Sequence, residues 1–142
     1  MKKLEQNIDL SFNYTKADFG DDFLWGVASS AFQTEGHHNK FGRGESIWDE
    51  FSSRKKAILN NDSPNIATNF YENYKEDIKL VKALSIPYFR FSISWSRILP
   101  NGTGEINREG INFYNDVLDA CKENKTSSPK DCPKKFGLNR KS

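Results

Sequence analysis

A helical repeat that runs directly into an alternating strand is the feature that most constrains how this chain can fold. Between residues 64 and 84, apolar side chains recur at steps of three and four, which predicts a helix with one buried face. Ser63 and Pro64 fit the N-cap and the first position of that helix. Between residues 86 and 95 the apolar side chains alternate instead, which predicts a strand. A helix followed at once by a strand indicates part of a βα repeat.

Further segments extend this pattern in both directions. Residues 23–28 read as a buried strand, and the residues after Asn107 carry apolar side chains at helical spacing. Residues 37–65 are rich in Gly, Asn, Ser, Lys and Asp, which predicts a long loop whose SIWDEF stretch offers apolar anchors. The order strand, loop, helix, strand, turn and helix is typical of an α/β fold with a parallel sheet.

The strand at 86–95 presents two chemically different faces. The apolar face carries Phe89, Phe91, Ile93 and Trp95, and the other face carries Tyr88, Arg90, Ser92 and Ser94. If the second face is buried, Arg90 needs a carboxylate partner, because burying an unpaired guanidinium is costly. The alternative is that Arg90 reaches solvent at the end of the strand. The pattern alone leaves both interpretations open.

Two polar residues, Gln33 and Glu35, follow the first strand. An amide both donates and accepts hydrogen bonds, which suits ligand hydroxyl groups, and α/β folds bind ligands at the carboxyl ends of their strands. Gln33 is therefore a candidate ligand-binding residue, with a loop-bracing amide as the alternative. For Glu35, a bracing carboxylate beside Gly36 is favoured over an acid catalyst.

The charge and cysteine content argue against several classes of function. The chain has 142 residues and a net charge of +2, which gives no basis for binding nucleic acid or an anionic membrane. No run approaches the length of a membrane helix, and no secretory signal is visible at the N-terminus. Cys121 and Cys132 do not form a metal-binding pair, so we expect no metal site and a reduced, cytoplasmic location.

Four blocks, in the same order, resemble the family 1 glycoside hydrolases, the β-glucosidase family. The blocks are FLWGVASSAFQTEG at 23–36, GRGESIWDEF at 42–51, YKEDIKLVKAL at 74–84 and YFRFSISWSRILPNG at 88–102, and GINFYNDVLD at 110–119 also fits. The resemblance extends over residues 18–125. The chain departs from the family pattern at His37, where a small residue is usual, and at Asn69, where an Asp is common.

This resemblance implies a (β/α)8 TIM barrel, of which the chain would supply the first two βα units. It implies a retaining enzyme that hydrolyses terminal β-D-glucosyl or β-galactosyl residues with two glutamates and no metal or organic cofactor. In the family, the residue matching Gln33 hydrogen-bonds sugar hydroxyls, and the residue matching Arg90 hydrogen-bonds the nucleophilic glutamate. The residue matching Glu35 braces the site. The expected partner is a β-glucoside substrate, with no nucleic acid and no membrane.

The chain lacks the family motifs that carry the chemistry. The acid/base motif T-x-N-E-P and the nucleophile motif E-N-G are both absent from the sequence. We therefore divide the chain into a loose arm at 1–17, the barrel part at 18–125 and an atypical tail at 126–142. A frameshift, an internal deletion or a gene-model error would each produce such a tail. Without either catalytic glutamate, we expect this chain alone to be inactive.

Two other functions stay open at the level of sequence. A 6-phospho-β-glucosidase would share these blocks, because its phosphate-binding residues would lie in the later part of the barrel. A non-catalytic sugar-binding or interaction remnant would use Gln33 and nearby aromatic side chains instead. Titration with glucose or gluconolactone would separate a binding remnant from an inert one.

Overall fold

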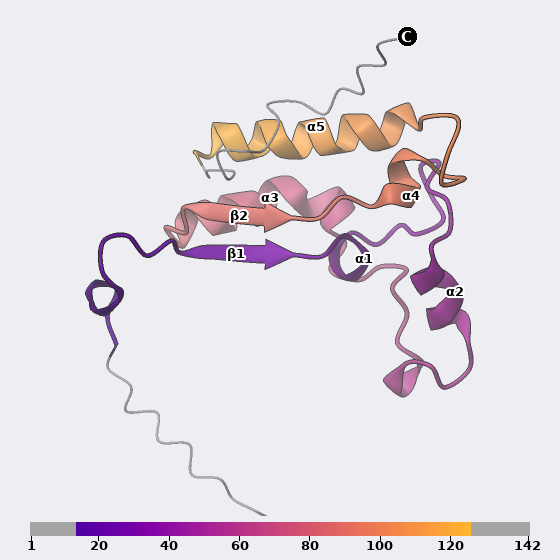
Figure 1. Cartoon of the computed structure of the whole chain (residues 1–142), viewed down its shortest axis with the longest axis horizontal. Coiled ribbons are helices and arrows are strands. Elements are labelled where there is room, and N and C mark those ends of the chain that lie inside the picture. The colour runs from indigo at the N-terminus through magenta and orange to yellow at the C-terminus, as the bar shows by residue number, and fades with distance from the viewer. Residues whose placement is uncertain (1–13, 126–142) are drawn as a thin grey trace, which may run out of the picture.

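The computed structural model describes residues 14–125, whose arrangement Figure 1 shows. Two short parallel strands lie side by side, and each is followed by helices before the chain continues. Residues 1–13 of the expected arm and the atypical tail expected at 126–142 lie outside the described residues.

The two predicted βα units are confirmed, although both strands are shorter than predicted. Strand β1 spans Gly26–Ser29 and strand β2 spans Tyr88–Phe91. They pair in parallel, with Val27 opposite Phe89 and Ala28 opposite Arg90. The helices are α1 (Ala31–Thr34), α2 (Ile47–Ser53), α3 (Phe70–Ala83), α4 (Trp95–Ile98) and α5 (Arg108–Glu123), with short 3-10 turns at Lys16–Phe19 and Leu59–Asn61.

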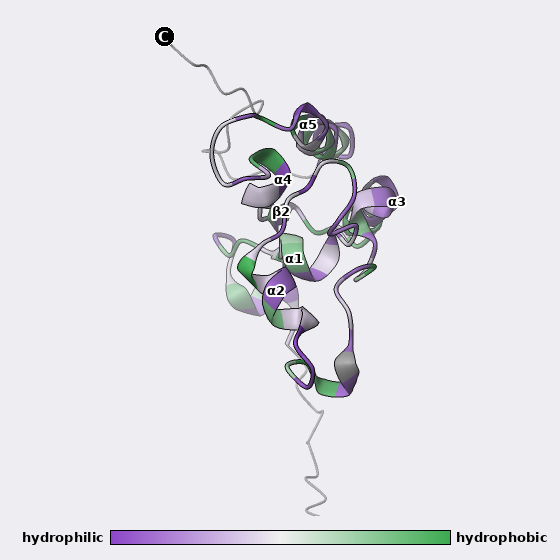
Figure 2. Ribbon diagram, turned by 90° about the vertical axis from the view of Figure 1, so that its right-hand side faces the viewer, coloured by the Kyte–Doolittle hydropathy of each residue, from purple (hydrophilic) through white to green (hydrophobic). Residues whose placement is uncertain are grey.

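The hydrophobic core lies between β2 and the two long helices, α3 and α5. Ile78 of α3 and Val117 of α5 are fully buried, and Phe89 of β2 is buried in the same cluster. Figure 2 looks at the carboxyl ends of the strands and shows α3 and α5 as the helices beside β2. The predicted alternation of β2 is confirmed, because Phe89 and Phe91 pack in this core whereas Arg90 is exposed.

Helix α5 begins where the sequence predicts, directly after Asn107. The Asn107 side chain accepts a hydrogen bond from the backbone N–H of Glu109 at 3.2 Å, which satisfies one free donor of the first turn. Its amide nitrogen also donates to the backbone oxygens of Phe41 and Arg97, at 2.8 and 3.0 Å. This one side chain therefore fixes the start of α5 against the loop after β1 and against α4.

Helix α3 begins at Phe70 rather than at Pro64, so the predicted N-cap at Ser63 is wrong. Asn69, which directly precedes the helix, has φ +57° and lies in the left-handed region. A right-handed helix does not continue through a residue in that conformation. The helical spacing of apolar residues thus begins several residues before the helix itself.

Tertiary hydrogen bonds explain why the residues before α3 are not helical. The backbone oxygen of Asn65 accepts from the backbone N–H of His37 at 2.8 Å. The Thr68 hydroxyl donates to the backbone oxygen of Thr34 at 3.0 Å. Contacts with the segment after β1 therefore override the local helical preference of residues 64–69.

The long loop predicted at 37–65 contains a helix, α2, over its SIWDEF stretch. Ser46 precedes the helix as its N-cap, and the Asp49 carboxylate accepts hydrogen bonds from the Ser46 backbone N–H (2.7 Å) and hydroxyl (2.6 Å). The bond from the Ser46 backbone N–H to the side chain at N3 is that of a capping box, here with Asp in place of the usual Glu.

Trp95, predicted as the last apolar residue of the second strand, lies in α4 instead. Strand β2 ends at Phe91, and the backbone N–H of Arg97 donates to Ser94 at 3.1 Å, which begins the turn of α4. The Trp95 indole is 63% exposed, and its N–H donates to the backbone oxygen of Gly102 at 3.0 Å. The alternation along 86–95 therefore overestimates the length of the strand.

The face of the sheet opposite the core is open among the described residues. Ala28 and Arg90, which pair across the two strands, are both exposed. Large apolar side chains of α2, which lies beyond the carboxyl ends of the strands (Figure 1), are exposed as well, among them Ile47 at 81% and Trp48 at 55%. Parallel sheets in complete α/β folds are covered on both faces. The open face of the sheet and the exposed side of α2 are therefore both suited to further packing.

We expect Ile78→Ala to lower the free energy of unfolding by about 2–5 kcal/mol, because it leaves a cavity in a fully buried site. Leu80→Ala in the same helix is the control, since Leu80 is 61% exposed and its loss should cost within about 0.5 kcal/mol. Urea unfolding followed by circular dichroism at the helical band measures both. Equal losses for the two variants would contradict the placement of the core.

Candidate functional site

Gln33 lies just beyond the carboxyl end of β1, in the single turn of α1. Its backbone N–H donates to the oxygen of Ser30 at 3.0 Å, and the backbone N–H of Ala31 donates to the Ser92 hydroxyl at 2.8 Å. The turn is therefore tied to the segment that follows β2. The Gln33 side chain is exposed and makes no hydrogen bond to any residue within 14–125. An amide in this position is available to a ligand at the strand ends.

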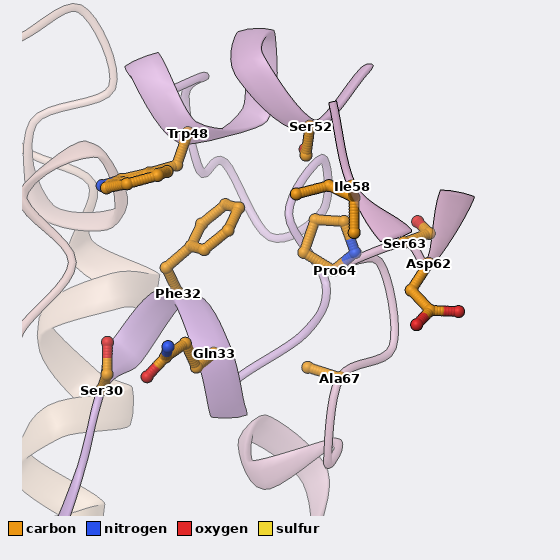
Figure 3. Close-up of a pocket in the computed structure, with 10 residues that line it drawn as sticks. All are labelled: Ser30, Phe32, Gln33, Trp48, Ser52, Ile58, Asp62, Ser63, Pro64 and Ala67. Carbon is orange, nitrogen blue, oxygen red and sulfur yellow. The ribbon is translucent and has the colours of Figure 1, made fainter. Parts of the chain in front are cut away.

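A pocket of about 470 Å³ opens beside Gln33, as Figure 3 shows. Its walls come from α1, α2 and the segment before α3. The lining residues are Ser30, Phe32, Gln33, Trp48, Ser52, Ile58, Asp62, Ser63, Pro64 and Ala67. The rings of Phe32 and Trp48 lie with their centroids 6.0 Å apart on one side of it. Its volume falls within the range of small-molecule sites, about 300–1,000 Å³.

Arg90 lies on the open face of β2, in register with Ala28. Its side chain is exposed, and it forms no ion pair with any residue in the described part of the chain. The carboxylate partner that a buried Arg90 would require is therefore not supplied by residues 14–125. Of the two interpretations left open by the sequence, the solvent-reaching guanidinium is the one seen in this structure.

Glu35 is the buried carboxylate of the region. The side chain is 4% exposed, and its two oxygens have different partners. Oε2 accepts from Arg97 Nε at 2.9 Å, and Oε1 accepts from the Tyr114 hydroxyl at 2.7 Å. The Tyr114 oxygen in turn accepts the backbone N–H of Ser94 at 2.7 Å. Glu35 thus braces the segment after β1, as the sequence favours, and it offers no free oxygen for acid catalysis.

Arg97 is fully buried beside Glu35 and is held on several sides. Its Nη2 donates to the backbone oxygen of Gly36 at 3.3 Å, and its guanidinium lies 4.5 Å from the centroid of the Tyr71 ring. Gly36 has φ +69°, and a Cβ there would collide with the backbone oxygen of Ile66, so only glycine fits. The guanidinium has little freedom to move away from the carboxylate.

The ionisation of this cluster follows from its burial. Burial raises the pKa of Glu35 above its ordinary value, while the Arg97 charge and the hydrogen bonds from Tyr114 and Arg97 act in the opposite direction. Burial, with the adjacent Glu35 carboxylate, also raises the pKa of Tyr114 well above its ordinary value. Tyr114 therefore keeps its proton and acts as a hydrogen-bond donor to Glu35.

A second buried ion pair fixes the loop between α1 and α2. Arg43 Nη2 lies 2.9 Å from Asp49 Oδ2, and both side chains are 4% exposed. Arg43 Nη1 also donates to the backbone oxygen of His38 at 2.6 Å. Burial alone raises the pKa of Asp49, but the hydrogen bonds from Arg43 and Ser46 outweigh it and hold that pKa below its ordinary value.

Sequence reasoning missed both partners of Glu35, namely Arg97 and Tyr114. The contacts join residues 62 and 79 positions apart, so no local spacing reveals them. One signal was available, because Arg97 is a lone cation between the apolar residues Trp95 and Ile98. It is the kind of residue that must find a carboxylate if the surrounding segment is buried.

Two candidate features, a membrane-spanning helix and a metal-binding cluster, are absent from residues 14–125. No helix in that range has the length and apolar character needed to cross a membrane. Within the same range, no group of three or more His, Cys, Asp or Glu side chains is placed to hold a metal ion.

Comparisons with known proteins agree on one family. The family model described as glycosyl hydrolase family 1 matches residues 15–129. The chain is 44% identical to β-glucosidase A of Acetivibrio thermocellus over 110 residues, which cover 78% of this chain and 25% of that protein. It is 47% identical to β-glucosidase 4 of Oryza sativa subsp. japonica over 105 residues, which cover 73% of this chain and 22% of that protein.

Solved structures give the same result for the fold. The family 1 β-glucosidase from Thermotoga maritima superimposes with a TM-score of 0.73 at 42% identity, over 76% of this chain and 24% of that one. Structures of that enzyme in complex with castanospermine and with deoxynojirimycin also match. The chain thus spans about a quarter of the length of the relatives that it matches.

We expect Asp49→Asn to destabilise the protein by about 1–3 kcal/mol near neutral pH, because the charge-assisted hydrogen bonds to Arg43 and Ser46 are weakened. The folded-state pKa of Asp49 lies below 3.8, so the stability it contributes is present above that pH and is lost as the pH falls through the lowered pKa. The penalty should therefore shrink in acid. Urea unfolding at several pH values measures it, with Asp116→Asn as an exposed control. A penalty that did not change with pH would contradict the account.

Proposed function

Because this chain belongs to glycosyl hydrolase family 1, we propose that it supplies the N-terminal quarter of a retaining β-glucosidase. Its fold is that of the first two βα units of a (β/α)8 barrel. The proposed reaction is hydrolysis of terminal β-D-glucosyl residues, with β-galactosyl residues as a further substrate class. The relatives reported above carry the name β-glucosidase, which supports unphosphorylated glucosides over 6-phospho-glucosides.

The observation that carries this proposal is the placement of Gln33. It stands exposed at the carboxyl end of β1, beside a pocket, with both its amide donors and its carbonyl acceptor free of described partners. Sugar hydroxyl groups need that combination of donor and acceptor. We propose that Gln33 hydrogen-bonds the hydroxyls of the glucosyl unit.

We propose a supporting electrostatic role for Arg90. Its guanidinium is exposed on the face of β2 opposite the core, where the interior of a closed barrel would lie. A cation there favours the ionised form of a nearby carboxylate, and a retaining glycosidase needs one ionised glutamate as nucleophile. The second glutamate would act as acid and base, about 5–5.5 Å from the first. Both glutamates would come from other strands of the barrel, since the family motifs that carry them are absent from this sequence.

The remaining expectations are consistent with this proposal. The chemistry uses two carboxyl groups and water, so it requires no metal or organic cofactor. The proposed partner is a β-glucoside, and neither nucleic acid nor a membrane has a role in it. The cytoplasmic location expected from the sequence stays a prediction.

A hybrid barrel tests the proposal directly. Residues 15–125 of this chain replace the matching quarter of the Thermotoga maritima β-glucosidase A, with which it is 44% identical over 105 residues. We expect the hybrid to hydrolyse 4-nitrophenyl β-D-glucoside and the 142-residue chain alone to release no nitrophenol. Gln33→Ala should lower kcat/KM of the hybrid by about 10- to 100-fold, because hydrogen bonds to the sugar are lost.

Arg90→Met in the hybrid should lower kcat by about a hundredfold or more, because the nucleophile loses its neighbouring cation. The matched control is Arg54→Met, since Arg54 pairs with Glu50 on the exposed surface of α2. Thermal unfolding of each hybrid shows whether the barrel is intact. An intact hybrid that kept full activity without Gln33 and Arg90 would overturn the assigned roles.

A further inference from the structure

We propose that Glu35, Arg97 and Tyr114 are positioning residues that hold Gln33 in place for the sugar. This inference rests on the proposed function of Gln33 in binding glucosyl hydroxyls. It adds three buried residues, none of which touches the pocket, to the set that determines sugar binding.

Gln33 cannot hold its own position. It belongs to a helix of four residues, which is too short to be stable in water without tertiary support. The Gln33 side chain makes no hydrogen bond to the described residues, so its location depends on the backbone of α1 alone. The contacts that fix the two ends of α1 therefore also fix the position of the Gln33 side-chain amide.

The first end of α1 is fixed by Ser92, whose hydroxyl accepts the backbone N–H of Ala31 at 2.8 Å. The second end is fixed by Glu35, which directly follows the helix as its C-cap residue. The backbone oxygen of Glu35 also accepts the N–H of Tyr71 from α3 at 3.1 Å. The turn that carries Gln33 is thus held between the segment after β2 and helix α3.

The Glu35 carboxylate connects the two strand ends through Tyr114. The Tyr114 hydroxyl donates to Glu35 Oε1 at 2.7 Å and accepts the backbone N–H of Ser94 at 2.7 Å. One phenol oxygen therefore sets the separation between the segment after β1 and the segment after β2. Because the exposed fraction of the whole residue is 3% for Glu35 and 1% for Tyr114, water has little access to replace that oxygen.

Arg97 holds the other carboxylate oxygen of Glu35, Oε2. The Arg97 guanidinium donates to Glu35 Oε2 at 2.9 Å. The backbone oxygen of Arg97 accepts a hydrogen bond from Asn107 Nδ2 at 3.0 Å. A Cβ at Gly110 would collide with that backbone oxygen, so α5 packs directly on α4 at this point. The carboxylate is held by two partners that are themselves fixed to α5.

The test uses Tyr114→Phe in the full 142-residue chain, which removes one oxygen and keeps the buried ring. Hydrogen exchange by NMR reads the amides of residues 33–35, which donate to Ser30 and Ala31. We expect their exchange to accelerate about tenfold or more, while protected amides of α3 change by less than about threefold. A merely structural role would accelerate every protected amide by the same factor. Tyr74→Phe is the control, because Tyr74 also contacts Phe113 but does not bond Glu35.

Titration of the hybrid barrel with deoxynojirimycin, with which the Thermotoga maritima enzyme has been solved in complex, provides the second reading at the side-chain amide signal of Gln33. We expect a saturable shift for the unaltered hybrid and severalfold weaker binding for the hybrid that carries Tyr114→Phe. Local exchange that accelerates in the chain, without any ligand-induced shift in the hybrid, would support the positioning network and contradict the proposed function. A ligand-induced shift with the same affinity in both hybrids would support the proposed function and overturn the inference. Unprotected amides at 33–35 in the unaltered chain would also overturn it.

Discussion

The buried ion pair between Glu35 and Arg97 joins the two βα units of this chain. Glu35 comes from the segment after β1 and Arg97 from the segment after β2, and Tyr114 of α5 binds the same carboxylate. Taking both charges out of water costs several kcal/mol each, so the pair is tolerated only because each oxygen of Glu35 has a donor. Removing one partner would leave the other charge buried and unpaired. The positions of α1, α4 and α5 therefore depend on this contact.

The same constraint explains how a short, loop-rich region can hold the exposed amide of Gln33 at the carboxyl end of β1. Gln33 stands two residues before Glu35, so a carboxylate buried against α4 and α5 fixes a side chain that is itself exposed. Gly36 and the hydrogen bond from the Ala31 backbone N–H to the Ser92 hydroxyl complete the geometry at the carboxyl end of β1. A retaining glycosidase requires such a preorganised sugar site as well as its two glutamates. Under the proposed function this chain supplies part of the first requirement, whereas the family motifs for the second are absent from its sequence.

Local patterns predicted the parts of the fold that depend on local chemistry. Helix α5 follows Asn107 as predicted because an Asn cap acts within its own turn, and Phe89 faces the core because strand alternation is local. Helix α3 begins later than predicted because hydrogen bonds with the backbone of His37 and Thr34, far earlier in the chain, hold the residues before it. The proposed roles of Gln33 and Arg90 came from the family resemblance, because the sequence pattern alone left a purely structural alternative open for each residue. The Glu35, Arg97 and Tyr114 cluster could not be predicted from spacing, because it joins segments that are distant in sequence.

A double-mutant cycle on Glu35 and Arg97 tests the central claim most directly. The free energy of unfolding is measured for the unaltered chain, Glu35→Gln, Arg97→Met and the double variant. If the pair joins the two units, the single losses are not additive, and the coupling energy is about 2 kcal/mol or more. Additive losses, with a coupling energy below about 0.5 kcal/mol, would show that the two side chains do not stabilise the fold through each other.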